Sequence, residues 1–180
     1  MSITPGTHKL GPDNGTLTVN TGRSGAAAKA GHDLTIHVDV WEATLTIGED
    51  PAQSSLTLDA DASSLRVVNG SGGIQSLGDD DKENIKKTID DDVLKRESIQ
   101  FRSTSVQADD SGKLTVQGDL TMRGKTSPIT FDLAVGDDDK VSGTAVVKQT
   151  DFKMKPYSAL FGALKVADEV KVAIEECSLS

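Results

Sequence analysis

Several residue types are scarce in this chain of 180 residues, and each shortage excludes a class of protein. With a single cysteine, Cys177, no intrachain disulfide can form, which excludes a disulfide-stapled fold. No stretch approaches the roughly 18 consecutive apolar residues of a membrane-spanning helix, so we expect no stable membrane insertion. The N-terminus lacks the charged start, apolar run and cleavage site of a secretory signal. These features predict a soluble cytoplasmic protein, or a periplasmic or secreted one whose leader has been removed.

Basic residues are outnumbered, because 19 Lys and Arg stand against 28 Asp and Glu and give a formal net charge of −9. A negative field repels phosphate backbones and anionic bilayer surfaces. We therefore expect no nucleic-acid partner and no binding to membranes through a basic patch. The Asp triplets at 79–81, 90–92 and 137–139 do not match the spacing of a calcium loop, so they predict solvated turns and helix ends rather than a metal site.

Residues with catalytic chemistry are few, since the chain has three histidines and one cysteine. It contains no H-E-x-x-H, C-x-x-C, G-x-S-x-G, G-x-G-x-x-G or P-loop motif, which predicts a protein that is not an enzyme. His32 stands out because it lies where a glycine-containing segment enters a long strand. Neighbours on a strand point to opposite faces, so a direct dyad with Asp33 is disfavoured. His32 is the candidate polar anchor for a ligand; the alternatives are an ordinary loop histidine or a catalytic base.

The segment 113–135, KLTVQGDLTMRGKTSPITFDLAV, alternates apolar and polar residues with the period of a half-buried strand. Gly, Lys, Ser and Pro in residues 123–128 predict a tight polar turn between two antiparallel arms. Such a hairpin must bury its apolar face against something. That face carries Leu114, Val116, Leu120 and Met122 in the first arm and Ile129, Phe131, Leu133 and Val135 in the second.

The same alternation recurs along most of the chain and predicts a mainly β fold with one domain spanning residues 1–180. Short, turn-rich connections between the last strands predict antiparallel neighbours. Eight such strands can stack as a sandwich or close into a barrel, and closure is favoured because it removes exposed edges. The eight segments are 15–21, 34–47, 53–62, 98–108, the two arms within 113–135, 140–150 and 166–178.

Two segments depart from the strand pattern. Residues 80–93 predict a helix, because Ile85, Ile89 and Val93 recur at four-residue spacing after an acidic start. The glycine-rich residues 67–78 before it predict a flexible loop. A second, short helical turn is predicted at about 157–164, where Pro156 suits a helix start.

The interior of the predicted barrel is lined by small side chains. Gly143 and Ala145 fall on inward positions of the seventh strand, and Gly118 interrupts the fifth. Unfilled apolar volume is costly, so the interior either holds a ligand or collapses onto its small residues. The apolar connection around Pro156 is either a plug or the entrance for a ligand. The candidate ligand-binding residues of the lining and mouth are Leu114, Val116, Leu120, Met122, Ile129, Phe131, Leu133, Val141, Ala145, Phe152, Met154, Tyr157, Leu160 and Phe161.

The second half of the chain resembles the YceI-like family, the lipocalin-like polyisoprenoid-binding proteins of bacteria. The resemblance rests on SIQFRSTSV at 98–106, LTVQGDLTMRGKTSPITFDL at 114–133, TDFKM at 150–154 and DEVKVAIE at 168–175. It implies an eight-stranded antiparallel lipocalin-like β-barrel whose elongated channel holds the isoprenoid tail of a quinone or polyprenyl lipid. It brings no catalytic residue.

These observations predict non-enzymatic binding or transport of an isoprenoid or other amphiphilic lipid in an internal apolar channel. No cofactor is expected other than a bound polyisoprenoid or isoprenoid quinone. The alternative is a stress-related or structural barrel that is packed shut and acts through protein–protein contacts, including a homodimer. An enzyme resting on His32 is a third hypothesis.

Overall fold

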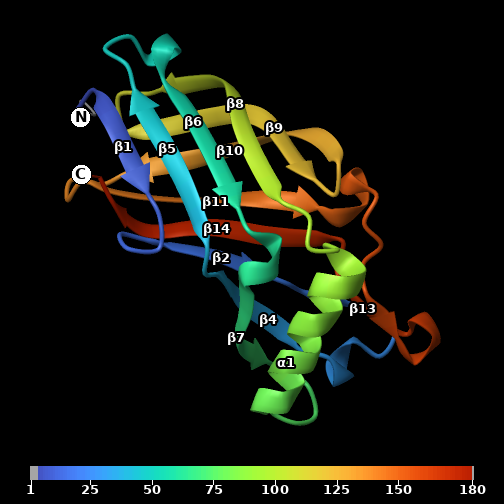
Figure 1. Cartoon of the computed structure of the whole chain (residues 1–180). Coiled ribbons are helices and arrows are strands. Elements are labelled where there is room, and N and C mark those ends of the chain that lie inside the picture. The colour runs from blue at the N-terminus through green and yellow to red at the C-terminus, as the bar shows by residue number, and fades with distance from the viewer. Residues whose placement is uncertain (1–3, 180) are drawn as a thin grey trace.

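Eleven strands form one antiparallel sheet in the computed structural model, which describes residues 4–179 (Figure 1). The sheet curls into a half-barrel that leaves α1 (Asp79–Thr88) across one end. Across the sheet the strands follow the order β1 (Gly6–Leu10), β5 (Trp41–Ile47), β6 (Ser55–Ala60), β8 (Ile99–Ala108), β9 (Lys113–Met122), β10 (Lys125–Val135), β11 (Lys140–Lys148), β14 (Glu169–Ser178), β2 (Thr16–Asn20), β4 (Asp33–Val38) and β7 (Leu65–Ser71).

The predicted mainly β, antiparallel class is confirmed, but the predicted count of eight strands in a closed barrel is wrong. The predicted strand 34–47 bends at Asp39 and Val40 and becomes β4 and β5. At this corner Asp39 N donates to Ser64 O (3.1 Å) and Asp61 N donates to Val40 O (3.0 Å), so the ladder continues while the strands change direction. β7 occupies the start of the predicted loop 67–78, and β1 lies in a segment for which no strand was predicted.

The hairpin of β9 and β10 follows the predicted alternation. Its inward positions on β9 are all buried, whereas its connection is shorter than the predicted 123–128. Only Arg123 and Gly124 form the turn, both with positive φ (51° and 67°), as a two-residue hairpin turn requires. The strand β10 then begins at Lys125 and includes Pro128, which lies opposite Asp119.

The predicted helical turn at about 157–164 is wrong, because most of this segment forms a hairpin. β12 (Ser158–Ala159) pairs with β13 (Leu164–Val166), and β13 pairs with β3 (Arg23–Ser24) in a second, three-stranded sheet. Only the tip, η6 (Leu160–Gly162), forms a turn of 3₁₀ helix. Pairing with β3, more than a hundred residues away in sequence, outweighs the local signal of Pro156.

The predicted helix 80–93 exists with different bounds. The α-helical part is α1, and a π-helical turn, η4 (Ile89–Val93), follows it. Gly78 precedes the helix, and Asp81 Oδ2 accepts a hydrogen bond from Gly78 N (2.9 Å). Within residues 4–179 no helix is long and apolar enough to cross a membrane. The remaining 3₁₀ turns are η1 (Ala28–Ala30), η2 (Pro51–Gln53), η3 (Ala62–Ser64) and η5 (Gln149–Phe152).

Candidate functional site

A cavity of about 540 Å³ lies between the inner face of the curled sheet and the helix. Nine strands of the main sheet supply its walls, and Ile85, Ile89 and Val93 supply the cover. These three residues are the ones whose spacing predicted the helix. The π-helical turn makes the last turn wider than an α-helical one, and Val93 still faces the cavity with the other two.

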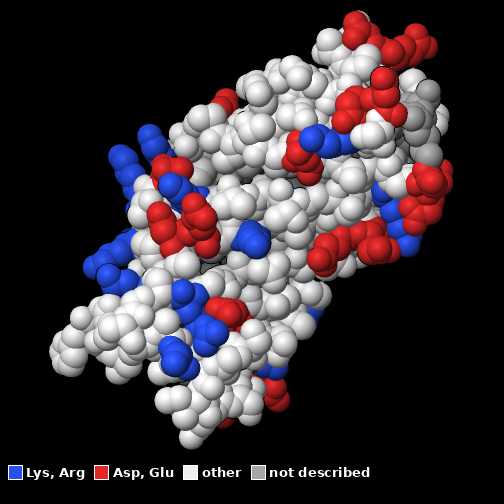
Figure 2. Space-filling view, turned by 180° about the vertical axis from the view of Figure 1, so that it is seen from behind, with Lys and Arg blue, Asp and Glu red and all other residues white. Residues whose placement is uncertain are grey.

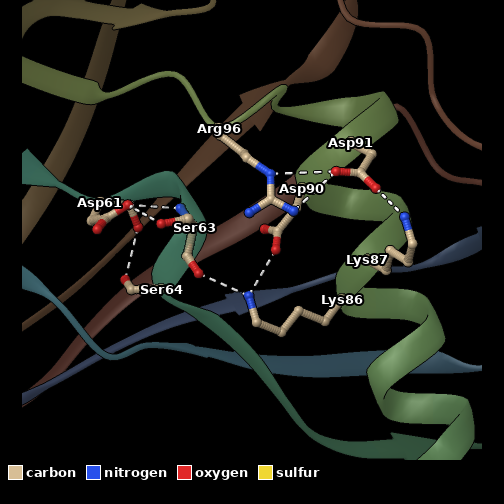
Figure 3. Close-up of polar contacts among 8 residues, drawn as sticks. All are labelled: Asp61, Ser63, Ser64, Lys86, Lys87, Asp90, Asp91 and Arg96. Atoms are coloured by element: carbon tan, nitrogen blue, oxygen red, sulfur yellow. Dashed lines mark hydrogen bonds and ion pairs between the residues drawn. The ribbon is translucent and has the colours of Figure 1, made fainter.

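The helix is fastened to the sheet corner by one lysine (Figure 3). Lys86 Nζ donates to Ser63 O of η3 (2.8 Å) and to Asp90 Oδ2 (2.9 Å). Asp90 is buried, with 4% of its surface exposed. A second set of ion pairs, Lys87 and Arg96 with Asp91, lies on the exposed side of the same helix. Lys86 therefore holds the cover of the cavity in place.

The interior has a hollow half and a packed half, and the predicted lining residues divide between them. Leu114, Val116, Val141 and Phe152 are at most 1% exposed and lie in the packed core outside the cavity. Leu160 and Phe161 lie outside it too, at the surface. The predicted residues that do line the cavity are Leu120, Met122, Ile129, Phe131, Leu133, Ala145, Met154, Tyr157 and His32.

The inward glycines create less space than the sequence suggested. A Cβ on Gly118 would lie 2.5 Å from Cζ of Phe101, so the ring of Phe101 occupies the space above this glycine. A Cβ on Gly143 would likewise lie 2.6 Å from Cδ2 of Leu133. The ring of Phe101 also packs on Phe131 at the cavity wall, with ring centroids 5.4 Å apart. The cavity exists because the helix stands over the sheet, and not because glycine side chains are missing.

Many lining residues were not predicted, most of them in the first half of the chain. The signal for them was available, because they fall on the apolar parity of their strands or on the apolar spacing of the helix. The pattern marks a residue as inward-facing without saying whether it meets a neighbour or an open space. These residues include Val19, Leu34, Ile36, Val38, Leu56, Leu58, Ile85, Ile89, Val93, Ile99, Phe101, Val170, Val172 and Ile174.

Two of the polar side chains that line the cavity, Arg23 and His32, bond the backbone nearby, and His32 holds the glycine-rich loop 67–78. Arg23 forms a two-point ion pair with Asp33 (3.0 and 3.2 Å) and donates to Gly31 O (2.8 Å). His32 Nε2–H donates to Gln75 O at 2.6 Å. A Cβ on Gly73 would lie 2.4 Å from His32 Nε2, so only glycine allows the loop to approach so closely. His32 and Asp33 therefore bond different partners and form no dyad.

The mouth is also fastened at the start of β14. Asp168 accepts hydrogen bonds from the hydroxyl of Thr150 (2.7 Å) and from its backbone N–H (2.9 Å). These bonds favour the charged carboxylate and hold the pKa of Asp168 below its ordinary value. Next to it, Gln149 lines the cavity and donates to Ala167 O (3.1 Å). Within residues 4–179 no group of His, Cys, Asp or Glu is arranged to hold a metal ion.

A sequence model described as the YceI-like domain matches residues 14–176. The chain belongs to the YceI-like family. This YceI-like chain is similar in fold to BcnA of Burkholderia cenocepacia, with a TM-score of 0.62 and 17% identity over 88% of this chain and 93% of BcnA. It is also similar to the YceI protein of Campylobacter jejuni, with a TM-score of 0.57 and 18% identity over 81% of this chain and 84% of that one. No curated protein matches this YceI-like chain significantly.

Proposed function

We propose that the protein is a non-enzymatic carrier that holds the apolar chain of an isoprenoid or another amphiphilic lipid in its cavity. The observation that carries the proposal is the apolar hollow half of the interior, open at a polar mouth. Its volume falls within the range of roughly 300–1,000 Å³ that is usual for ligand sites. Membership of the YceI-like family supports a lipid-binding barrel at the level of the family.

Burial of an apolar chain supplies enough free energy for this function. Each buried methylene contributes about 0.8 kcal/mol, so a five-carbon isoprene unit contributes roughly 4 kcal/mol before ordering costs. Association costs are roughly 4–15 kcal/mol, which a few units offset. Since the lining of the cavity is mostly apolar, we expect affinity to depend on the length and shape of the chain more than on its head group.

The hollow interior favours a ligand over the alternative of a barrel packed shut. An apolar space of this size leaves its lining without contacts on one side, which weakens the fold unless something fills it. In the packed half of the core, the side chains of the same sheet fill the interior completely. No comparable observation favours a structural protein that acts through protein–protein contacts.

The experiment is native mass spectrometry of the purified protein, with solvent extraction to identify what it carries. Ala145 faces the cavity and Val146, the next residue of β11, is half exposed on the outer face. Ala145→Phe should fill part of the cavity and abolish lipid retention, while Val146→Phe should retain it. Leu120→Asp should also lose the lipid, because it places a charge in the apolar wall.

A complementary experiment adds a short-chain isoprenoid quinone to the protein after its own lipid has been extracted. Quenching of Trp41 fluorescence, or the increase in mass, measures the uptake. If a folded Ala145→Phe protein carried lipid at the wild-type ratio, the ligand would lie elsewhere. If the wild type neither carried lipid nor took up the quinone, the carrier function would be wrong.

A further inference from the structure

The β12–β13 hairpin exposes its largest apolar side chains to water. Phe161 is 113% exposed and Leu160 is 59% exposed, both at the tip of the hairpin. Tyr157, half exposed, lies at its base. Folded proteins rarely present such side chains together, and where they do the patch commonly binds a partner or a membrane.

The backbone of the tip is held in a conformation that its residues disfavour. Leu160, Phe161 and Gly162 have φ values of 51°, 56° and 87°. Left-handed backbone suits glycine and asparagine, whereas bulky side chains adopt it at a cost. Strained residues that the surrounding structure keeps in place occur often at functional sites. Here the strained residues are the two apolar side chains that the hairpin projects into solvent.

Lysines surround this hairpin in an otherwise acidic chain. Residues 152–167 contain three Lys and no Asp or Glu, and residues 22–32 contain Arg23 and Lys29 and again no acid. η1, which carries Lys29, is joined to the hairpin by a hydrogen bond from Ala27 N to Ala163 O (2.8 Å). Among the described residues, no ion pair involves Lys29 or the three lysines of the hairpin segment, Lys153, Lys155 and Lys165.

The charges of the molecule are therefore unevenly distributed, although Asp151 and Asp168 flank the hairpin segment and Asp33 pairs with Arg23. Figure 2 shows an uncharged lobe projecting at the lower left, where Figure 1 places the hairpin; the charged side chains beside it are mostly Lys and Arg with some Asp and Glu, and Asp and Glu predominate at the opposite upper right. The acidic first turn of α1, Asp79–Asp81, lies apart from the hairpin (Figure 1). The net charge of −9 thus does not describe this corner of the protein.

The same hairpin forms part of the cavity mouth. Tyr157, Leu164 and Val166 line the cavity, and so does Lys165. A surface that bound the exposed tip would lie directly beside the opening.

We infer that the β12–β13 hairpin docks on the surface of an anionic lipid bilayer. Leu160 and Phe161 enter the interface between head groups and acyl chains, and the four lysines lie against the anionic head groups. Docking is shallow and reversible, and it turns the cavity mouth towards the membrane while the acidic end points away. It differs from the expectation drawn from net charge, that the protein has no membrane-binding basic patch. It does not depend on whether the cavity holds a lipid.

The test is flotation of the full chain with vesicles of equal parts phosphatidylcholine and phosphatidylglycerol, compared with phosphatidylcholine alone. We expect binding to the anionic vesicles that weakens as salt is added. Phe161→Asn removes the apolar ring and introduces a residue that tolerates left-handed backbone. The variant should therefore fold normally and bind the anionic vesicles roughly tenfold more weakly. Val146→Asn, at an exposed apolar site on the outer face of β11, should bind like the wild type.

Two double variants with the same net charge distinguish the effect of the lysines near the hairpin from the effect of overall charge. Lys153→Gln with Lys155→Gln should weaken binding about tenfold or more. Lys9→Gln with Lys140→Gln changes the net charge equally, away from the hairpin, and should have little effect. Equal loss in both double variants, no binding by the wild type, or a dimer in solution that Phe161→Asn dissociates would each overturn membrane docking.

Lipid extraction from the same proteins distinguishes this inference from the carrier function. Phe161→Asn should retain its lipid while losing vesicle binding. An empty wild-type protein that still floats with anionic vesicles would contradict the carrier function and leave docking supported.

Discussion

Individual residues at the packed end of the sheet leave no spare volume. Cys177 is fully buried, and its Sγ lies where a Cβ on Gly15 would come within 1.9 Å. Gly15 therefore permits the close approach of β14. From sequence, Cys177 was interpreted only as the residue that excludes an intrachain disulfide. Its packing partner lies more than 150 residues away and has no local signal.

The Cys177 thiol should be unreactive in the native protein. Burial raises the pKa of this thiol, so little nucleophilic thiolate forms near neutral pH, and the sulfur is also shielded from reagents. We expect a maleimide to label it only after unfolding in urea, as followed by intact mass. Gly15→Ala should lower the free energy of unfolding by about 1–3 kcal/mol through overpacking and speed the labelling. Rapid labelling of the native wild type would contradict this account.

At the scale of elements, the cover of the cavity depends on one partly buried ion pair. Asp90 is buried, and its Oδ1 has no hydrogen-bond partner among residues 4–179, so Lys86 is the main group that offsets its charge. The helix itself is short and has no fully buried residue, so its other packing is limited to partly buried side chains such as Ile85. Its position over the cavity therefore responds strongly to this contact.

Lys86→Met should destabilise the protein by on the order of 3–5 kcal/mol, because it leaves the buried Asp90 carboxylate unpaired. Lys87→Met, one residue along, removes only an exposed pair and should cost less than about 1 kcal/mol. Urea denaturation followed by circular dichroism measures both. The double variant Lys86→Met with Asp90→Leu should recover most of the loss. Equal effects of the two lysine changes would show that the buried pair does not fasten the helix.

Elements were predictable where their signal is local. The alternation in β9 and β10 and the isoleucine spacing across α1 and η4 indicated which faces turn inward. β1, β7 and the small sheet were missed because each depends on a partner distant in sequence, such as the pairing of Val166 with Arg23. The hairpin at 158–166 shows the reason, since Pro156 favours a helix start locally but strand pairing decides the outcome.

At the scale of the whole molecule, carboxylates that are hydrogen-bonded in the fold link stability to pH. Asp61 accepts bonds from the hydroxyl and backbone N–H of Ser63, and Asp168 accepts the same pair from Thr150. These bonds hold the pKa values of Asp61 and Asp168 below the ordinary value. Both contacts hold the backbone next to the end of a strand or a 3₁₀ turn, so their loss should destabilise the segments around the cavity.

Stability should fall in acid. Because the folded pKa values lie below that of an unfolded aspartate, about 3.9, the stabilisation is complete above this pH and is lost as pH falls through the folded values. We expect a lower urea midpoint at about pH 3 than at about pH 6. Asp168→Asn should reduce this difference. A midpoint that rises on acidification would contradict the assignment.

The amino-acid sequence by itself determined that this chain forms an antiparallel sheet with one apolar face, places a helix after residue 78, and resembles the YceI-like family. These properties follow from periodicity and motifs, which are local. Only the tertiary structure decided that Leu114 and Val141 lie in a packed core while Leu120 and Ala145 face a cavity, because the distance between helix and sheet separates the two groups. It also decided that the segment carrying Lys29 lies against the hairpin carrying Phe161, since net charge carries no information about position.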